Sequence, residues 1–200
     1  MTDRRTFLAA GATLGALHLA GCAGTADGGW TALFDGKSTT GWSPLGPVKW
    51  SVANGVLEGA GGGGGDKAGY LVSAGSFGDY DLRVEFWASA DANSGVFIRC
   101  QDRNKVGADS SYEVNIWDQA PRPWYSTGSI VNFASVGDPV PKAADRWNVF
   151  EIAARGDRVT VVLNGRQTVD MVNGKFASGP IALQSAGGTI RFRDVRIRAV

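Results

Sequence analysis

The sequence predicts an all-β fold, a sandwich or jelly roll built from two antiparallel sheets. Short segments alternate apolar and polar residues, which is the pattern of half-buried strands, and Gly, Asn, Asp and Pro separate these segments. Helical periodicity is nearly absent, and glycine makes up 29 of the 200 residues, about twice its usual share, without the three-residue repeat of collagen. About ten short strands without crossover helices favour this architecture over a parallel α/β fold.

The alternation is clearest in residues 81–88, where Leu82, Val84 and Phe86 share one face and polar or aromatic residues share the other. Six further segments show it: residues 95–101, 112–118, 146–154, 157–165, 180–185 and 189–198. Each segment is expected to be a strand with one buried face.

Two Asn-Gly pairs, Asn54-Gly55 and Asn164-Gly165, lie between such segments. They suit two-residue hairpin turns, which need positive φ at both central positions. Residues 50–60 and 159–172 are therefore expected to form hairpins.

The last segment changes phase along its length. Its apolar positions are even at Ile190 and Phe192 but odd at Val195 and Ile197. One extra residue near Asp194, a β-bulge, would keep a single face buried throughout. The opposite, solvated face would then carry Arg191, Arg193, Arg196 and Arg198.

The N-terminal 22 residues have the features of a bacterial export signal. Arg4-Arg5 precedes an apolar stretch that is too short to cross a bilayer, and Cys22 ends a lipobox-like sequence. We therefore predict a twin-arginine lipoprotein signal over residues 1–21, a flexible tether over 22–29 that begins with lipidated Cys22, and a folded domain over 30–200. This places the protein in the bacterial cell envelope, on the periplasmic or surface side, with the lipid as its only membrane contact. An ordinary cleaved signal that happens to end in cysteine is the alternative.

Several function classes are excluded by what remains after residues 1–21 are removed. The rest has 18 basic and 18 acidic residues and no basic stripe that would indicate nucleic-acid binding. The glycine run Gly61–Gly65 lacks the Lys-Ser/Thr of a phosphate-binding loop and is expected to be a flexible loop.

The only histidine, His18, lies in the signal, which excludes Ser-His-Asp and Cys-His catalysis. Acid–base chemistry would fall to Asp, Glu, Lys, Tyr or a metal-bound water.

A set of short motifs spans nearly all of residues 30–200 in a fixed order. They are Trp30-x-x-Leu33-Phe34-Asp35-Gly36-Lys37 with Gly41-Trp42, Trp50-x-Val52-x-x-Gly55-x-Leu57, Phe77-Gly78-Asp79-Tyr80-Asp81-Leu82, Asn93-Ser94-Gly95-Val96-Phe97-Ile98-Arg99, Tyr112-Glu113-Val114, Trp147-Asn148, Leu163-Asn164-Gly165, Ile181-Ala182-Leu183-Gln184 and Phe192-Arg193-Asp194-Val195-Arg196-Ile197. In this order and spacing the chain resembles the 3-keto-disaccharide hydrolase family, which has a concanavalin A-like jelly roll. The chain departs from that family at Ala186, where many members have His, and at Asn115, where Gln is usual.

The resemblance implies a hydrolase or lyase that cleaves 3-keto-glycosides. A C3 ketone acidifies the C2 proton, so a carboxylate can remove it, and the resulting enediolate can expel the C1 oxygen by β-elimination; water can then add to the 2-hydroxy-glucal. This chemistry needs a base, an electrophile for the oxyanion and a proton donor, but no nucleophilic serine and no redox cofactor. A divalent cation is possible, because oxygen-only sites leave little trace in a sequence. The main alternative is a non-catalytic, lectin-like carbohydrate-binding domain on the same sheet.

Arg99 and Glu113 are the leading catalytic candidates. Each is out of phase with its aliphatic neighbour, Ile98 or Val114, so both are expected to face one concave polar surface. Glu113 would be the base, and Arg99 would stabilise the oxyanion or grip sugar hydroxyls. A cross-strand salt bridge between the two is an equally supported alternative.

Other candidates surround this pair. Asn115 and Trp117 share the phase of Glu113 and would bind hydroxyls and stack on a sugar ring, although core packing is the commoner role for such a Trp. Asp118 could be a second carboxylate or a cation ligand, or it could cap a turn. The resemblance implies substrate contact for Gln184, and Trp124 could wall the cleft from the Pro-rich loop or anchor that loop in the sandwich.

Overall fold

The computed structural model describes residues 28–200, so the predicted signal, lipidated Cys22 and most of the predicted tether lie outside the described residues. The described part is nearly all β and forms two antiparallel sheets, which confirms the predicted fold class. Sheet A contains β1 (Thr31–Ala32), β3 (Lys49–Ala53), β4 (Val56–Ala60), β6 (Tyr80–Ala88), β9 (Trp147–Arg155), β10 (Arg158–Leu163), β11 (Arg166–Val172) and β13 (Thr189–Ala199). Sheet B contains β2 (Trp42–Leu45), β5 (Gly69–Ser73), β7 (Ser94–Ile98), β8 (Tyr112–Ile116) and β12 (Ala182–Ser185). Two single-turn 3₁₀ helices, η1 (Gly65–Lys67) and η2 (Pro123–Tyr125), lie in the connections.

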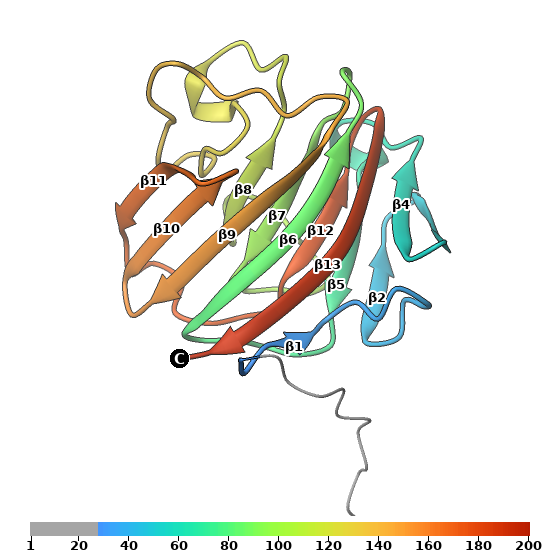
Figure 1. Ribbon diagram of the computed structural model, residues 1–200, viewed down its shortest axis with the longest axis horizontal. Coiled ribbons are helices and arrows are strands. Elements are labelled where there is room, and N and C mark those ends of the chain that lie inside the picture. Colours follow the sequence, from blue (N-terminus) through green and yellow to red (C-terminus); the bar gives the residue numbers. More distant parts are fainter. Residues whose placement is uncertain (1–27) are drawn as a thin grey trace, which may run out of the picture.

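The strand orders are β11-β10-β9-β6-β13-β4-β3 in sheet A, with β1 on β13, and β2-β5-β12-β7-β8 in sheet B. Figure 1 shows the long strands β9, β6 and β13 of sheet A lying across the shorter strands of sheet B. Most neighbours in sheet B are distant in sequence, since β12 inserts between β5 and β7. Sheet B therefore brings together side chains from four separate segments of the chain.

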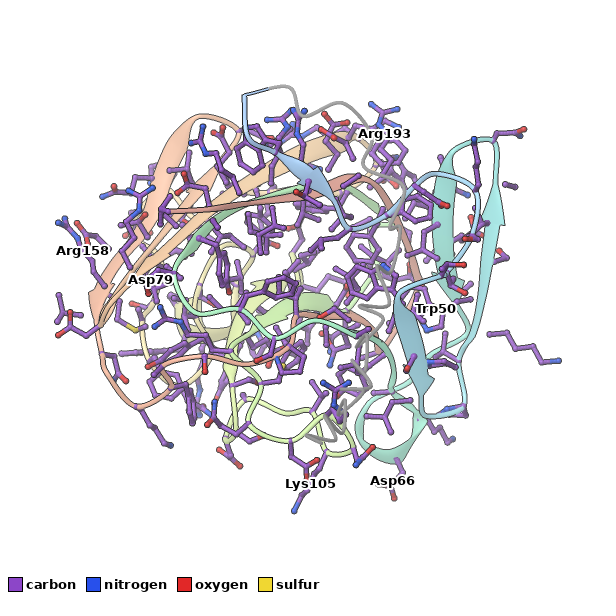
Figure 2. The ribbon with its side chains drawn as sticks, turned by 90° about the horizontal axis from the view of Figure 1, so that it is seen from below. Trp50, Asp66, Asp79, Lys105, Arg158 and Arg193 are labelled. Atoms are coloured by element: carbon purple, nitrogen blue, oxygen red, sulfur yellow. The ribbon has the colours of Figure 1, made fainter. Side chains whose placement is uncertain are left out.

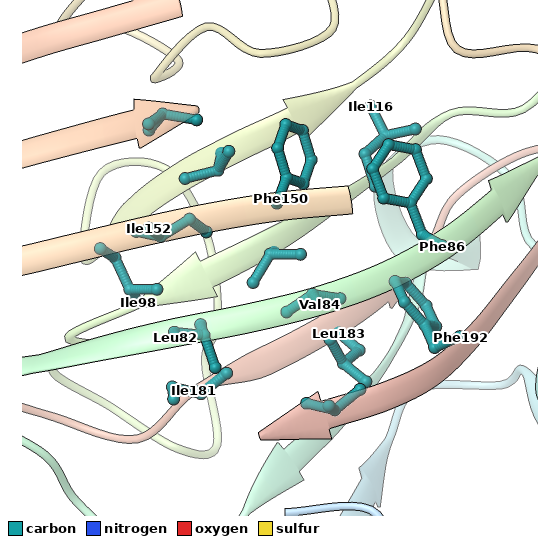
Figure 3. Packing of buried hydrophobic residues seen from close by; sticks show 14 of the residues in the cluster. Leu82, Val84, Phe86, Ile98, Ile116, Phe150, Ile152, Ile181, Leu183 and Phe192 are labelled. Carbon is teal, nitrogen blue, oxygen red and sulfur yellow. The ribbon is translucent and has the colours of Figure 1, made fainter. Parts of the chain in front are cut away.

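The core fills the space between the sheets. In β6, burial alternates residue by residue, and Leu82, Val84 and Phe86 are buried as predicted. They meet apolar side chains from sheet B, among them Ile98 and Leu183 (Figure 3). In Figure 2, charged side chains such as Asp66, Lys105 and Arg158 project outward, whereas side chains fill the space between the sheets. No helix within residues 28–200 is long and apolar enough to cross a bilayer.

The predicted hairpins and bulge are confirmed. Asn54 and Gly55 connect β3 to β4 with φ of 52° and 80°, and Asn164 and Gly165 connect β10 to β11 with φ of 51° and 81°. The register of β13 against β6 shifts between Arg193 and Arg196, around Asp194 with φ 48°. The extra residue keeps the apolar residues of β13 directed at the core.

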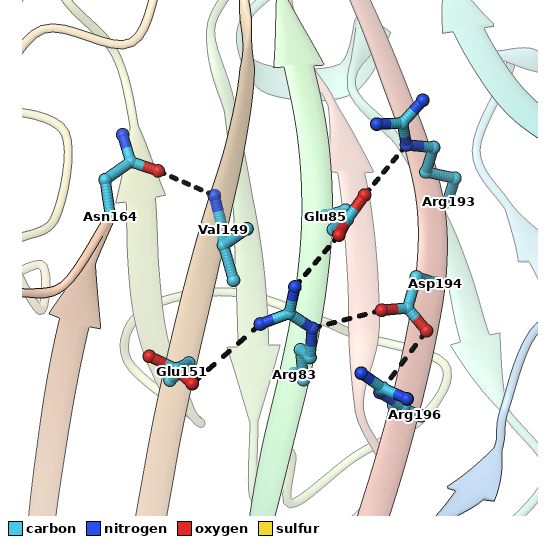
Figure 4. Close-up of polar contacts among 8 residues, drawn as sticks. All are labelled: Arg83, Glu85, Val149, Glu151, Asn164, Arg193, Asp194 and Arg196. Atoms are coloured by element: carbon cyan, nitrogen blue, oxygen red, sulfur yellow. Dashed lines mark hydrogen bonds and ion pairs between the residues drawn. The ribbon is translucent and has the colours of Figure 1, made fainter.

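The arginines of β13 lie on the outer face of sheet A, as predicted, but they do not make it basic. Arg191 pairs with Glu58, and Arg193 pairs with Glu85. Arg196 pairs with Asp194, and Arg198 pairs with Asp81. Figure 4 shows the part of this network around Arg83 and Arg193. The guanidinium of Arg193 also lies 3.9 Å from the ring centroid of Trp147. Exposed pairs of this kind contribute little stability each, so this face is a neutralised surface.

Candidate functional site

A recess of about 220 Å³ lies on the outer face of sheet B, the side turned away from the core. It is lined by Gly64, Gly65, Ala68, Tyr70, Asn93, Glu113, Asn115, Trp117, Tyr125, Val131, Gln184 and Ala186. The floor comes from β5, β12 and β8, with Asn93 just before β7, and the glycine-rich loop and η2 contribute to its rim. Hollows beside Trp147, Trp30 and Tyr80 are larger, at about 320, 240 and 380 Å³, but every carboxyl group that lines them is paired with an arginine.

Glu113 is placed in the recess by the two-residue period of β8. Val114 points into the core and is fully buried, so the adjacent Glu113 faces the opposite side. Burial alone raises the pKa of Glu113 to about 8. The residues that line the recess include no Lys or Arg that would offset this effect. Glu113 is therefore a carboxyl group that can accept a proton near neutral or mildly alkaline pH.

Gly95 makes the room that the Glu113 side chain occupies. It lies on β7, directly opposite Asn115 on β8. A Cβ at this position would lie 3.1 Å from both Cγ and Oε1 of Glu113, which is closer than ordinary contact. The missing side chain, rather than an unusual φ, is what the site requires here.

We expect Gly95→Ala to lower catalytic activity by displacing the Glu113 carboxylate. A shift of a few tenths of an ångström would be enough to relieve the contact, and because a misplacement of about 1 Å costs about 100-fold in rate, we expect a loss of about several-fold. The measurement is kcat/KM on a glycoside of the class that the sequence resemblance implies, together with the melting temperature. Gly78→Ala is the matched control, because nothing lies within 4 Å of a Cβ there. Unchanged activity in Gly95→Ala would show that the position of Glu113 is not critical.

Asn115 and Gln184 each bring an unpartnered acceptor to the recess. The two residues are 2% and 7% exposed. Nδ2 of Asn115 donates to the carbonyl of Tyr125, and Nε2 of Gln184 donates to the hydroxyl of Tyr70 at 3.3 Å. Both amide oxygens are buried and have no hydrogen-bond partner in the described part of the chain. Such groups are costly when unpaired, so a hydroxyl donor that reached either oxygen would stabilise the site.

Tyr70 is a residue of the recess that the sequence analysis missed. It lies on β5 and pairs in register with Gln184 on β12. Burial is the largest influence on its hydroxyl and raises the pKa above the ordinary value, and the charge of Glu113 acts in the same direction. The sequence shows that Tyr70 and Leu71 point to opposite faces of their strand. It does not show that this strand pairs with one more than a hundred residues away.

The glycine run also has a role that composition did not indicate. A Cβ at Gly62 would lie 2.3 Å from the carbonyl oxygen of Ser185 on β12, so only glycine fits there. The close approach brings Gly64 and Gly65 to the rim of the recess. The run is therefore a wall of the site.

Four predicted substrate or catalytic residues do meet in the recess: Glu113, Asn115, Trp117 and Gln184. Ala186, which stands where the family usually has His, also lines it. Trp124 does not; it is 48% exposed on η2, while its neighbour Tyr125 lines the recess. Figure 1 shows η2 in yellow beyond the end of β8.

Asp118 anchors a loop and does not line the recess. Its carboxylate accepts hydrogen bonds from Oγ1 of Thr127 at 2.6 Å and from the backbone N–H groups of Ala143 and Ala144 at 2.7 and 2.8 Å. This contact pattern supports the turn-capping alternative. Within residues 28–200, no three His, Cys, Asp or Glu side chains form a group that could hold a metal ion.

The expectation that Arg99 shares a hollow with Glu113 is wrong. Strand β7 ends at Ile98, and Arg99 adopts φ 54°, which breaks the alternation and turns its side chain away from the recess. The side chain is fully buried, and it donates to the carbonyls of Gly78, Gly156 and Phe176. Its ion pair is with Asp79, at 3.1 Å, and not with Glu113. The structure gives Arg99 a position that ties three loops together.

Comparison with known proteins identifies related chains. The model of the 3-keto-alpha-glucoside-1,2-lyase-like domain matches residues 29–198. A 3-keto-disaccharide hydrolase of Bacteroides thetaiotaomicron is 30% identical over 150 residues, which are 62% of this chain and 52% of that protein. The chain thus spans about half the length of that relative.

Solved structures show the same fold. A glycosyl hydrolase candidate from Parabacteroides distasonis superposes with a TM-score of 0.72 at 25% identity, over 86% of this chain and 99% of that one. The carbohydrate-binding module CBM66 of Bacillus subtilis gives a TM-score of 0.63 at 18% identity, over 80% and 96% of the two chains. The second similarity concerns the fold alone.

Proposed function

The chain belongs to the 3-keto-alpha-glucoside-1,2-lyase-like domain family, and from this premise we propose that it cleaves 3-keto-glycosides by β-elimination in the recess of sheet B. The proposal is supported by one observation: the carboxyl group of Glu113, whose pKa is raised to about 8, faces a recess that is lined by no Lys or Arg. A carboxylate in this state is a stronger base than an ordinary surface Glu, and it is matched to a proton acidified by an adjacent ketone.

In the proposed reaction, ionised Glu113 removes the C2 proton of the bound sugar. The electron pair forms an enediolate across C2 and C3, and its collapse expels the glycosidic oxygen from C1. Water can add to C1 of the resulting 2-hydroxy-glucal, which completes a net hydrolysis. The reaction consumes no oxidant or reductant, because the substrate already carries the ketone.

The remaining lining groups account for binding. The amides of Asn115 and Gln184 line the recess, and a rotation of either one would bring its buried, unpartnered oxygen to a sugar hydroxyl. Trp117 offers an aromatic surface to the ring. A volume of about 220 Å³ is below the ~300–1,000 Å³ of drug-sized sites, which suits one sugar ring with its leaving group outside. A recess without cationic side chains favours a neutral sugar.

Activity is expected to rise with pH through about 8, because only ionised Glu113 can accept the C2 proton. The other titratable groups that line the recess are Tyr70 and Tyr125. The check is the dependence of kcat/KM on pH between about 5 and 10. An acidic limb near the ordinary Glu value of 4.5 would contradict a buried base.

The function itself is tested with a p-nitrophenyl 3-keto-glucoside and the matching glucoside without the ketone. We expect release of p-nitrophenol from the keto compound alone, since the unoxidised sugar has no acidified C2 proton. Cleavage of both compounds, or of neither, would refute the proposal. Binding of the keto sugar without turnover would favour the lectin-like alternative, and loss of turnover with a chelator would add a divalent cation to the mechanism.

We also propose that the protein works in the bacterial cell envelope, held by a lipid on Cys22. The support is the sequence of residues 1–22 alone, with its twin arginines, short apolar stretch and lipobox-like end. Mass spectrometry of the mature N-terminus decides the point. An unmodified N-terminal residue other than Cys22 would refute the lipid anchor.

A further inference from the structure

The elimination requires a proton donor for the departing oxygen, and the mechanism above leaves that group unassigned. Lys and Arg are absent from the residues that line the recess, and its only carboxyl group is already the base. Tyr70 and Tyr125 are the phenols at the recess. The choice of donor therefore depends on how these hydroxyls are held.

Tyr70 lies on the opposite side of the recess from Glu113. In sheet B, β12 and β7 separate β5, which carries Tyr70, from β8, which carries Glu113. A sugar ring between these strands would be approached by the two groups from different sides. This arrangement suits an α-glucoside, in which the C2 hydrogen and the C1 oxygen point to opposite faces of the ring.

The hydroxyl of Tyr70 is prepared for proton donation. Its oxygen accepts the N–H of Gln184 at 3.3 Å, which would stabilise a phenolate as the proton leaves. In the described part of the chain, the hydroxyl has no hydrogen-bond acceptor for its own proton, which is free for a ligand. The edge of the Tyr70 ring packs on Phe97, with centroids 5.5 Å apart and planes at 81°, and this contact fixes its direction. Phe97 is also the cross-strand partner of Glu113, so one side chain supports both groups.

We propose that Tyr70 is the general acid that protonates the leaving oxygen. This inference rests on the proposed function. Glu113 takes the proton from C2, the C1–O bond breaks, and the phenol proton moves to the departing alkoxide, leaving protonated Glu113 and the Tyr70 phenolate. In the hydration step, the oxygen of a water molecule bonds to C1 while the phenolate takes a proton from that water. Glu113 then returns its proton to C2. Both groups regain their starting states, and no external proton carrier is needed.

The protonation states agree with these roles. Burial raises the pKa of Tyr70 above its ordinary value, so its phenol stays protonated at the pH where Glu113 becomes ionised. The negative charge of Glu113 acts in the same direction. The pair therefore has one base and one acid over the same pH range.

The test uses two 3-keto-α-glucosides that differ only in the leaving group. Methoxide leaves poorly and needs protonation, whereas p-nitrophenolate leaves without it. We expect Tyr70→Phe to lower kcat/KM on the methyl compound by about 10²–10⁴-fold, the usual contribution of a general acid, and on the p-nitrophenyl compound by less than about tenfold. Tyr80→Phe is the matched control, because its hydroxyl is buried without a partner on β6 and lies outside the recess; both rates should be unchanged.

The outcomes separate the two proposals. An equal loss on both substrates would show that Tyr70 only binds or positions the sugar, and no loss on either would remove it from the mechanism. Both results would overturn the assignment while leaving 3-keto-glycoside cleavage intact. If the wild-type protein cleaves neither substrate, the proposed function fails and the assignment fails with it. Melting temperatures of the variants confirm that the compared proteins are folded.

Discussion

Glu113→Gln is expected to lower turnover of 3-keto-glycosides by about 10²–10⁴-fold and, at the same time, to stabilise the folded protein at alkaline pH. The loss follows because the amide keeps the shape of the side chain but cannot accept the C2 proton. The gain follows because the folded state holds Glu113 in a recess that disfavours its charged form. A residue that only supported the fold would not change these two properties in opposite directions.

The sign of the stability effect comes from the direction of the pKa change. The pKa of Glu113 is about 8 in the folded protein against 4.5 for an ordinary Glu, so the folded state binds this proton more tightly than the unfolded state. Stability from this group is complete below pH 4.5 and is lost as the pH rises through 8. Each pKa unit corresponds to about 1.4 kcal/mol, so removing the ionisation should increase the free energy of unfolding by about 2–4 kcal/mol at pH 8.

Denaturant unfolding of the wild type and Glu113→Gln at pH 5 and pH 8 measures this effect. The difference between the two proteins should be small at pH 5 and grow by pH 8. Glu58→Gln is the matched control, because Glu58 lies on the outer face of sheet A, paired with Arg191 and outside the recess. A stability difference independent of pH would mean that Glu113 is not held neutral, and full turnover in Glu113→Gln would remove it as the base.

The features that the sequence predicted correctly are those with local causes. The two-residue period alone places Val114 in the core and Glu113 on the outer face of sheet B. Asn54-Gly55 supplies the positive φ values that a two-residue turn requires. The phase change along β13 indicates a bulge, because a strand whose apolar residues change phase can keep one face buried only by inserting a residue. The insertion lies around Asp194.

The features that the sequence did not predict depend on contacts between distant segments. The expected strand over residues 95–101 ends at Ile98, and one residue of positive φ removes Arg99 from the face that the alternation assigned to it. Tyr70 reaches the recess because β5 pairs with β12, and no local pattern reveals that pairing. Strand order decides which side chains meet, whereas periodicity decides only the face on which each one lies.

Arg99→Met is expected to be strongly destabilising, and the reason is the set of groups that Arg99 satisfies. Its guanidinium is fully buried and donates to the carbonyls of Gly78, at 3.1 Å, Gly156, at 2.7 Å, and Phe176, at 3.1 Å. Met fills the volume of the aliphatic part but leaves these acceptors without their donor. Buried hydrogen bonds to a charged group contribute about 1.5–3 kcal/mol each, with losses that do not simply add, so we expect the free energy of unfolding to fall by about 3–5 kcal/mol.

The same variant separates a structural role from a catalytic one. The half-exposed carboxylate of Asp79 also accepts the backbone N–H of Gly156, so Asp79→Asn should cost much less stability than Arg99→Met and serves as its control. At a temperature where Arg99→Met remains folded, kcat/KM on a 3-keto-glucoside should stay within a few-fold of the wild type, because Arg99 does not line the recess. A loss of about 100-fold or more in the folded variant would restore Arg99 to the reaction, because it would mean that the guanidinium reaches the substrate during turnover. Retained turnover with reduced stability would show that Arg99, turned away from the recess by its positive φ, has a structural role in holding the loops. Oxyanion stabilisation would then come from other groups of the recess.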